Sequence, residues 1–393
     1  MQILLNDSFE NSFPKQSRRL RLGVVGGGRI AKLQATAARL TNRWEIVAGA
    51  FSSNSTKVKM AAKDWMVSED RSYRNFEEMA IEESKLEEGV DAVMVTTPNF
   101  LHYDNAKIFL ENGIGVICDK PMTNQIEEAE SLVTIAQKTK TPFTVSYVMS
   151  CFPMIRQARE IVGRGDIGEI NQIHLEFLQD WMTSEKISQE DHVKWRLDPK
   201  KSGLTSCVGD IGTHIAHLSE FITGLKMTDV KAHFYVCGAP KKLEDTAFMF
   251  LKFNNNIPGT LIATRLAPGN RGGLRVRIFG SKGGIEWDLE NSEYLKYNLF
   301  GKEDKIITRG YGSGVSKKIE RLINTARGFP EGIIEAWGNL YTEFAIKVAA
   351  YLDKGTYGQI SIDIPDALDG LKGVKFIHAS YRSNEKNGEW QKV

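Results

Sequence analysis

Lys120 is the residue whose type and place point most directly to chemistry. It stands in the segment Asp119-Lys120-Pro121, directly after an apolar run at residues 115–118 that predicts a buried strand. Open α/β sheets bind ligands at the carboxyl ends of their strands. A lysine there can donate to a substrate hydroxyl and stabilise an alkoxide as hydride leaves. We therefore predict that Lys120 is catalytic and that Asp119 lies beside a cofactor; the alternative is an ordinary surface charge.

Asp210, His214 and His217 form a second group, with helical spacing. A helix is predicted from about residue 210 to residue 223, and separations of four and three residues place these side chains on adjacent faces. A carboxylate near an imidazole keeps the ring basic, which suits removal of a proton from an alcohol. Two other interpretations stay open: Asp210 as a helix N-cap with both histidines in the core, and a metal site. We expect no metal, because Lys120 already supplies positive charge.

A glycine turn near the N-terminus predicts a dinucleotide site. Residues 22–31 read Leu-Gly-Val-Val-Gly-Gly-Gly-Arg-Ile-Ala, a strand that breaks into a turn and then a helix. Gly26, Gly28 and Ala31 take the small positions of the G-x-G-x-x-A pattern, which give a tight turn, room for a pyrophosphate and close helix–strand contact. Arg29 and Ile30 open the helix, whose N–H groups attract phosphate. Together with a lysine at a later strand end, the turn indicates a nicotinamide enzyme.

Two further segments are expected to contact the cofactor. One follows another predicted strand and contains Thr97, Pro98, Asn99 and His102; the other is a loop containing Trp195 and Arg196. Hydroxyl groups and a rigid proline can line a dinucleotide, and an aromatic ring can cover a nicotinamide. The alternatives are a plain Asn/Pro turn for the first segment and a capped surface loop for the second.

The type of cofactor is expected to be NAD. NAD enzymes usually carry an acid about twenty residues after the glycine turn, where it binds the ribose hydroxyls. Residues 50–57 contain no acid; Ser52 and Ser53 stand at the expected contact, and Lys57 can attract a 2′-phosphate. NADP therefore stays open.

The elements that must position these residues predict an α/β fold with two domains. Residues 20–150 alternate apolar strands with amphipathic helices, which is typical of a Rossmann domain with a doubly wound parallel sheet. Residues 151–393 predict a second, C-terminal domain with a large, mostly antiparallel sheet and helices on one face. Its expected strands are 170–179, 231–237, 246–253, 259–266, 274–280, 284–288 and 294–299. Its expected helices are 154–162, 333–352 and 366–382.

Composition excludes several classes of protein. The 393 residues carry a formal charge of only +2, so nothing suggests a nucleic-acid partner. Residues 1–19 contain no apolar core, so we expect an N-terminal arm and neither a signal peptide nor a membrane helix. The 4 cysteines are widely spaced without a C-x-x-C, which fits a reducing cytoplasm better than a disulfide framework.

Taken in order, these motifs resemble the Gfo/Idh/MocA oxidoreductase family over nearly the whole chain. The similarity is carried by the glycine turn, Thr97-Pro98-Asn99, Lys120-Pro121, Trp195-Arg196-x-Asp198-Pro199, Asp210-x-Gly212-x-His214 and the segment at residues 280–287. Within the family, residues 154–159 and 330–336 are most similar to the branch of levoglucosan and scyllo-inositol dehydrogenases.

The resemblance implies an NAD(P)-dependent dehydrogenase that oxidises a secondary hydroxyl of a sugar or cyclitol. Carried over, His214 is the general base, Lys120 orients the hydroxyl and stabilises the oxyanion, and Asp210 binds the substrate. The resemblance also implies that residues 151–393 bind the substrate and that their open sheet forms a homo-oligomer, a dimer or tetramer. Two other functions stay open: cleavage of glycosides through transient oxidation, and a non-catalytic regulator that senses dinucleotides.

Several positions depart from the branch, and we expect them to face the sugar. Tyr147 stands at a strand end where the branch has polar residues, Arg265 replaces a Gln, and Phe329 replaces a His before Pro-Glu-Gly. Tyr147, Arg265 and Asp180 are therefore expected to contact the substrate, together with the three catalytic residues.

Overall fold

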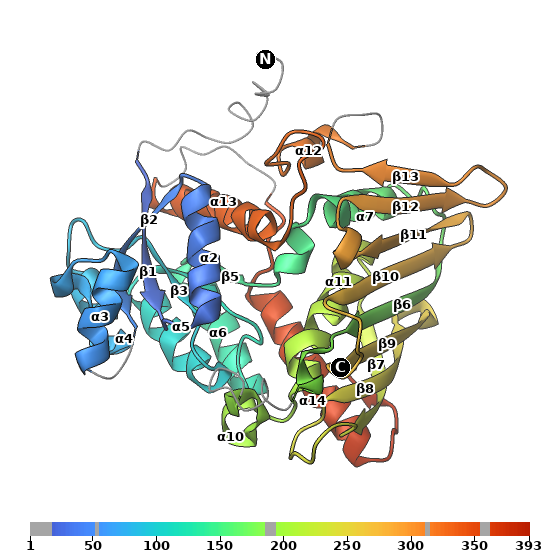
Figure 1. Cartoon of the computed structure of the whole chain (residues 1–393), viewed down its shortest axis with the longest axis horizontal. Coiled ribbons are helices and arrows are strands. Elements are labelled where there is room, and N and C mark those ends of the chain that lie inside the picture. Colours follow the sequence, from blue (N-terminus) through green and yellow to red (C-terminus); the bar gives the residue numbers. More distant parts are fainter. Residues whose placement is uncertain (1–17, 52–54, 185–193, 311–314, 354–361) are drawn as a thin grey trace. The chain divides into compact units, whose positions relative to one another are not determined.

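The computed structural model describes residues 18–51, 55–184, 194–310, 315–353 and 362–393. They divide into two units (Figure 1). The first consists of Met1–Val148 with Ile333–Leu371, and the second of Met149–Gly332 with Lys372–Val393. Ser52, Ser53 and most of the expected N-terminal arm lie outside the described residues.

The first unit contains the parallel sheet predicted from the sequence. Within the described residues, five strands pair in parallel in the order β2-β1-β3-β4-β5. β3 and β4 are buried along their whole length, as expected of strands covered on both faces. The strands are β1 (Leu20–Val25), β2 (Trp44–Ala50), β3 (Ala92–Val95), β4 (Gly115–Cys118) and β5 (Phe143–Val145). The helices between them are α2 (Arg29–Leu40), α3 (Ser55–Trp65), α4 (Phe76–Glu83), α5 (His102–Glu111) and α6 (Ile126–Thr139).

Helix α13 (Ile333–Leu352) also belongs to the first unit, although the sequence analysis assigned all residues after 150 to the C-terminal domain. Figure 1 shows it alongside α2. Trp44 explains the attachment, because its Nε1 donates to the carbonyl of Tyr341 at 2.9 Å and its ring stacks on Phe344 with centroids 5.7 Å apart. Trp337 further donates to the hydroxyl of Ser146 at 3.1 Å. The chain therefore returns to its first core after building the second.

The second unit is built on a large open sheet. Within the described residues it has nine strands in the order β13-β12-β11-β10-β6-β9-β8-β7-β14, and only β6 and β9 among them pair in parallel. The strands are β6 (Ile170–Leu178), β7 (Met227–Tyr235), β8 (Thr246–Phe253), β9 (Pro258–Thr264), β10 (Gly273–Gly280), β11 (Gly283–Asp288), β12 (Tyr294–Leu299), β13 (Lys305–Thr308) and β14 (Gln391–Lys392). This confirms the mostly antiparallel sheet that the sequence predicts.

Helices α7 (Pro153–Gly163) and α11 (Thr213–Thr223) pack against each other and against this sheet. Helix α14 (Ala367–Glu385) begins in the first unit and continues from Lys372 in the second, where the hydroxyl of Ser383 accepts from the N–H of Ala232 on β7 at 2.8 Å. Two short helices, α10 (Pro199–Ser202) and α12 (Lys317–Glu320), complete the regular structure of the described residues.

Candidate active site

The glycine turn after β1 has the geometry of a phosphate site. Gly26 adopts φ +96°, and a Cβ there would lie 3.1 Å from the backbone carbonyl of Thr96, so glycine is required. A Cβ on Gly28 would meet no atom of the described residues within 4 Å, so the backbone is open to a ligand there. Gly28 and Arg29 are exposed, Ile30 is half-buried, and residues 29–32 contain no acid that would repel phosphate. This turn therefore fits a pyrophosphate at the N-terminus of α2.

His102 joins two strand-end loops. Its Nε2 lies 2.8 Å from the carbonyl oxygen of Thr97, and its Nδ1 lies 2.9 Å from that of Pro121. The ring is only 1% exposed, and burial lowers its pKa while the charge of Asp119 opposes that shift. A neutral imidazole carries one N–H and donates to only one of the two carbonyls. His102, expected at the cofactor, is thus engaged with backbone and fixes the loops that follow β3 and β4.

The neighbours of His102 in the first loop are partly accessible. Thr97 and Pro98 are half-buried, and Asn99 is buried. The hydroxyl of Thr97 accepts from the side-chain amide of Asn105 at 2.8 Å. This hydrogen bond ties the loop to α5, while Thr97 and Pro98 stay partly accessible to a ligand.

Lys120 follows β4 as predicted. Both it and Asp119 are half-buried, and the carboxylate of Asp119 accepts from the N–H of Lys120 at 2.8 Å. The peptide bond between Lys120 and Pro121 is cis. Cys118, just before them, is fully buried, and burial raises the pKa of its thiol well above the usual value, which fits a small core residue. Tyr147, expected at the substrate, is likewise fully buried.

In the second unit, Asp210 lies in a π-turn, η6 (Val208–Gly212), which leads directly into α11. Gly212 occupies the N-cap position of α11, so Asp210 does not serve as that cap. His214 stands in the first turn of α11, is 8% exposed, and has its ring 6.5 Å from that of Phe177 on β6. His217 stacks on Phe221 with centroids 5.8 Å apart. A π-turn inside a helix is frequent at functional sites.

Arg265, which follows β9, is fully buried and forms an ion pair with Asp210. Its Nη2 lies 2.7 Å from Oδ2 of Asp210, while Nε of Arg196 lies 3.9 Å from the same oxygen. Arg265, expected at the substrate, is thus engaged with the carboxylate of Asp210. The reason is the placement of the end of β9 beside η6, which brings together residues 55 positions apart.

Three other candidates stand at the edge of this region. Trp195 and Arg196 are half-buried in a short 3₁₀ turn, with the guanidinium 4.5 Å from the indole centroid. The carboxylate of Asp198 then caps α10 by accepting from the N–H of Lys200 at 3.0 Å. Asp180 is half-buried, and Oδ2 accepts from the N–H of Gly269 at 3.4 Å. The loop that contains Trp195 is thus capped, as the alternative interpretation of a capped surface loop expects. The side chains of Trp195 and Arg196 in it stay partly accessible.

Sequence reasoning missed Glu244. This side chain is buried, and Oε1 accepts from the N–H groups of Ser206 and Val208, each at 2.9 Å. Burial raises the pKa of Glu244, while these N–H groups and Arg265 oppose the shift. The only signal in the sequence is an acidic pair, Glu244-Asp245, directly before an apolar strand.

The described residues offer little sign of a metal or a membrane. Among them, no group of three or more His, Cys, Asp and Glu side chains is placed to hold a metal ion. No helix in the same part of the chain has both the length and the apolar character needed to cross a bilayer.

Comparison with known proteins identifies the family. Residues 20–147 match the oxidoreductase family with an NAD-binding Rossmann fold, and residues 155–286 match the GFO/IDH/MocA C-terminal domain. An uncharacterized oxidoreductase of Bacillus subtilis, YfiI, is 31% identical over 95% of this chain and 97% of its own.

Two relatives have more specific descriptions. The levoglucosan dehydrogenase of Pseudarthrobacter phenanthrenivorans is 23% identical over 71% of this chain and 76% of its own. The crystal structure of an inositol dehydrogenase homolog from Azotobacter vinelandii, complexed with NADH and myo-inositol, matches with a TM-score of 0.87 and 26% identity, over 97% of this chain and 100% of that one. This chain therefore belongs to the Gfo/Idh/MocA family and is an NAD(P)-dependent oxidoreductase.

Proposed function

We propose that this protein oxidises a secondary hydroxyl of a sugar or cyclitol, with NAD as the hydride acceptor. The observation that carries the proposal is the pairing of Asp210 with Arg265 one turn before His214. The guanidinium holds the carboxylate through a charge-assisted hydrogen bond, and the carboxylate can accept further hydrogen bonds from hydroxyl groups. The likeness to a structure that contains NADH and myo-inositol supports the same class of substrate.

The residues divide the work of the reaction. His214 takes the proton from the reacting hydroxyl, Lys120 donates a hydrogen bond to its oxygen, and Asp210 accepts from the substrate. The O–H proton leaves to the imidazole, and the C–H bond breaks with its electron pair, so that the alcohol becomes a ketone. The chemistry that NAD supplies when bound is acceptance of that hydride.

The first unit is proposed to hold the dinucleotide. Gly26, Gly28 and the start of α2 bind its pyrophosphate, because the backbone is open there and the helix N-terminus carries partial positive charge. Thr97 and Pro98 line it beside Lys120. We keep NAD as the expected cofactor over NADP.

We also propose that the protein is a cytoplasmic homo-oligomer. On β8, Phe248 and Phe250 are 48% and 57% exposed, and Tyr235 of β7 is 49% exposed, on the face opposite the core residues Ala247, Met249 and Leu251. Aromatic side chains gathered on a sheet face mark an interaction surface. Light scattering is expected to give a dimer or tetramer, and Phe250→Lys to shift it toward the monomer; a monomeric wild-type protein would contradict the proposal.

The proposed function is tested by a panel of sugars and inositols, each incubated with NAD and with NADP while absorbance of the reduced cofactor is followed. We expect reduction of NAD with at least one cyclic polyol. Release of a free sugar without net reduction would indicate the glycoside-cleaving alternative. Inactivity across the panel, with retained affinity for the dinucleotide, would favour the regulator.

A further inference from the structure

Arg265 has a set of contacts that the proposed reaction does not yet use. The side chain is fully buried just after β9. Its Nη1 donates to the hydroxyl of Ser206 at 2.7 Å, and its Nη2 donates to the carbonyl of Ser206 at 2.9 Å and to Oδ2 of Asp210 at 2.7 Å. One guanidinium thus contacts two points of the segment at residues 206–212: Ser206 at its beginning and Asp210 within η6.

Glu244 holds the same segment from its N–H side. Oε1 accepts from Ser206 and Val208, and Oε2 lies 3.0 Å from the N–H of Ser206. The buried carboxyl group of Glu244 therefore binds the N–H groups of Ser206 and Val208, while the buried guanidinium of Arg265 binds the carbonyl of Ser206. The charges of Glu244, Arg265 and Asp210 alternate in sign, which offsets the cost of burying the first two.

We infer that Arg265 is a positioning residue for the reaction: it fixes the orientation of the carboxylate of Asp210, so that Asp210 binds the substrate while His214 moves the proton. The inference rests on the proposed function. The guanidinium of Arg265 lies 2.7 Å from Oδ2 of Asp210, so this oxygen is already engaged, and the imidazole in the next turn is left to accept the proton. The contacts of Arg265 and Arg196 both fall on Oδ2, so they hold the carboxylate in one orientation.

The planar fork of arginine is required for this role. Lysine in the same place keeps the charge but presents a single ammonium, which cannot reproduce the parallel contacts with Ser206 and Asp210. Arg265→Lys is therefore expected to keep the fold while Asp210 loses its fixed orientation. Small misplacements of a group at the reacting centre cost about 10²-fold in rate.

The experiment compares Arg265→Lys with Arg309→Lys, a matched change at another buried arginine of the same unit. Turnover, KM for the best polyol, affinity for NAD and melting temperature are measured for both. For Arg265→Lys we expect kcat to fall about 10²-fold, with less change in KM and no change in NAD affinity. For Arg309→Lys we expect wild-type kcat.

A second variant separates positioning from packing. Arg265→Ala removes the guanidinium, and added guanidinium ion at concentrations that do not unfold the protein is expected to restore kcat with saturation, whereas methylammonium is not. Should Arg265→Ala fail to fold, Arg265→Lys decides alone.

The outcomes distinguish this inference from the proposed function. If the wild-type protein oxidises a polyol but Arg265→Lys turns over as fast, the inference is overturned and the proposed function stands. Equal loss of kcat in Arg265→Lys and Arg309→Lys, in step with their melting temperatures, would also overturn it, because both arginines would then be merely structural. A wild-type protein inactive on the whole panel would overturn both.

Discussion

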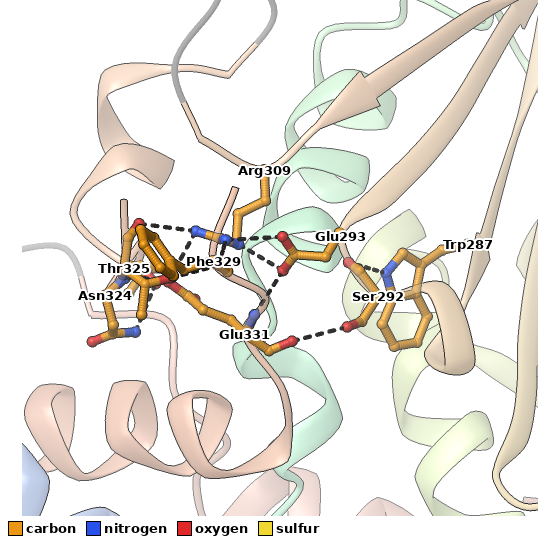
Figure 2. A network of polar contacts seen from close by, with 9 residues as sticks. Trp287, Ser292, Glu293, Arg309, Asn324, Thr325, Phe329 and Glu331 are labelled. Atoms are coloured by element: carbon orange, nitrogen blue, oxygen red, sulfur yellow. Dashed lines mark hydrogen bonds and ion pairs between the residues drawn. The ribbon is translucent and has the colours of Figure 1, made fainter. Parts of the chain in front are cut away.

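Two of the buried arginines of the second unit, Arg265 and Arg309, are neutralised in different ways. Figure 2 shows Arg309 among Glu293, Glu331 and the loop that ends at Phe329. Its Nε and Nη2 lie 2.6 and 2.8 Å from the two oxygens of Glu293, and its Nη1 lies 3.0 Å from Oε1 of Glu331. Both oxygens of Glu293 are therefore held by one guanidinium.

The remaining donors of Arg309 close a loop. They bind the carbonyls of Thr325 and Phe329 at 3.1 and 2.5 Å, and Glu331 accepts from the N–H groups of Asn324 and Thr325, each at 2.6 Å (Figure 2). All these groups lie between residues 293 and 331. Arg265 instead joins the end of β9 to a half-exposed carboxylate beside a candidate base. The comparison suggests that a buried arginine is structural where its partners form one loop, and positioning where its partner faces chemistry.

The largest expected effect concerns the stability supplied by Arg309. In Arg309→Met the buried Glu331 and the carboxylate of Glu293 lose their cation, which should lower the free energy of unfolding by about 3–5 kcal/mol. Urea denaturation followed by circular dichroism measures the change, with Arg309→Lys as the control that keeps the charge. Because Arg309 contacts residues between 293 and 331, outside the segment that contains Asp210 and His214, kcat of the folded variant should stay at the wild-type value. If Arg309→Met instead lost kcat without losing stability, Arg309 would act in the reaction and would not differ from Arg265 as proposed.

The loss of kcat in Lys120→Ala is the reference with which the loss in Arg265→Lys is compared. Removing one group that stabilises a developing oxyanion costs about 10²–10³-fold in kcat, so Lys120→Ala should lose at least as much as Arg265→Lys. The affinity for NAD, measured by titration of protein fluorescence, should change far less, since the glycine turn remains intact. Lys107→Ala, on the outer part of α5, is a control for removal of a lysine. Equal turnover in Lys120→Ala and the wild-type protein would end the assignment.

Two buried glutamates, Glu244 near Arg265 and Glu331 near Arg309, are expected to make the free energy of unfolding depend on pH. Burial raises the pKa of both Glu244 and Glu331 above the ordinary value of 4.5, while the neighbouring arginine opposes each shift. Such a carboxyl binds its proton more tightly in the folded state, so its contribution to stability is full below about pH 4.5 and is lost as pH rises through the folded pKa.

Replacing each glutamate by glutamine removes that titration. Relative to Glu244→Gln and Glu331→Gln, the wild-type protein should lose stability as pH rises from 4.5, by at most about 1.4 kcal/mol per pH unit. Urea denaturation across this range gives the three curves. Parallel curves for all three proteins would show that neither carboxyl titrates with a raised pKa.

Much of the fold follows from local pattern. The period of the apolar residues predicts the parallel sheet of the first unit and the strands β6 to β12 of the second, although the prediction for β7 begins at Lys231 and the strand begins at Met227. The two-residue β14 and the exposed β13 were not predicted, because short edge strands are defined by their partners and not by their own sequence. Helix α13 was predicted as a helix but not in its unit, since apolar residues on most of its surface do not reveal which core they join.

The candidate site shows the same limit more sharply. The residue types at Lys120, Asp210 and His214 suggested chemistry from their spacing alone. The partner of Asp210 could not be predicted, because Arg265 is 55 residues away and reaches Asp210 only where the fold places the end of β9 beside η6. Glu244 was missed for the same reason: it binds backbone N–H groups 36 and 38 residues away.

The smallest expected effect concerns Phe329, whose backbone carbonyl accepts a hydrogen bond from Arg309. Its side chain is 66% exposed, and its contacts with Arg309 and Thr325 are made by the backbone carbonyl. Phe329→His should therefore change the free energy of unfolding by no more than about 0.5 kcal/mol, as measured by urea denaturation, and Phe329→Ala serves as the control for simple loss of the ring. If the Arg309 network is only structural, KM for each polyol will also stay constant in both variants. A change of KM that is confined to Phe329→His would show that the loop reaches the substrate through this side chain, and Arg309 would then position a specificity residue just as Arg265 positions Asp210.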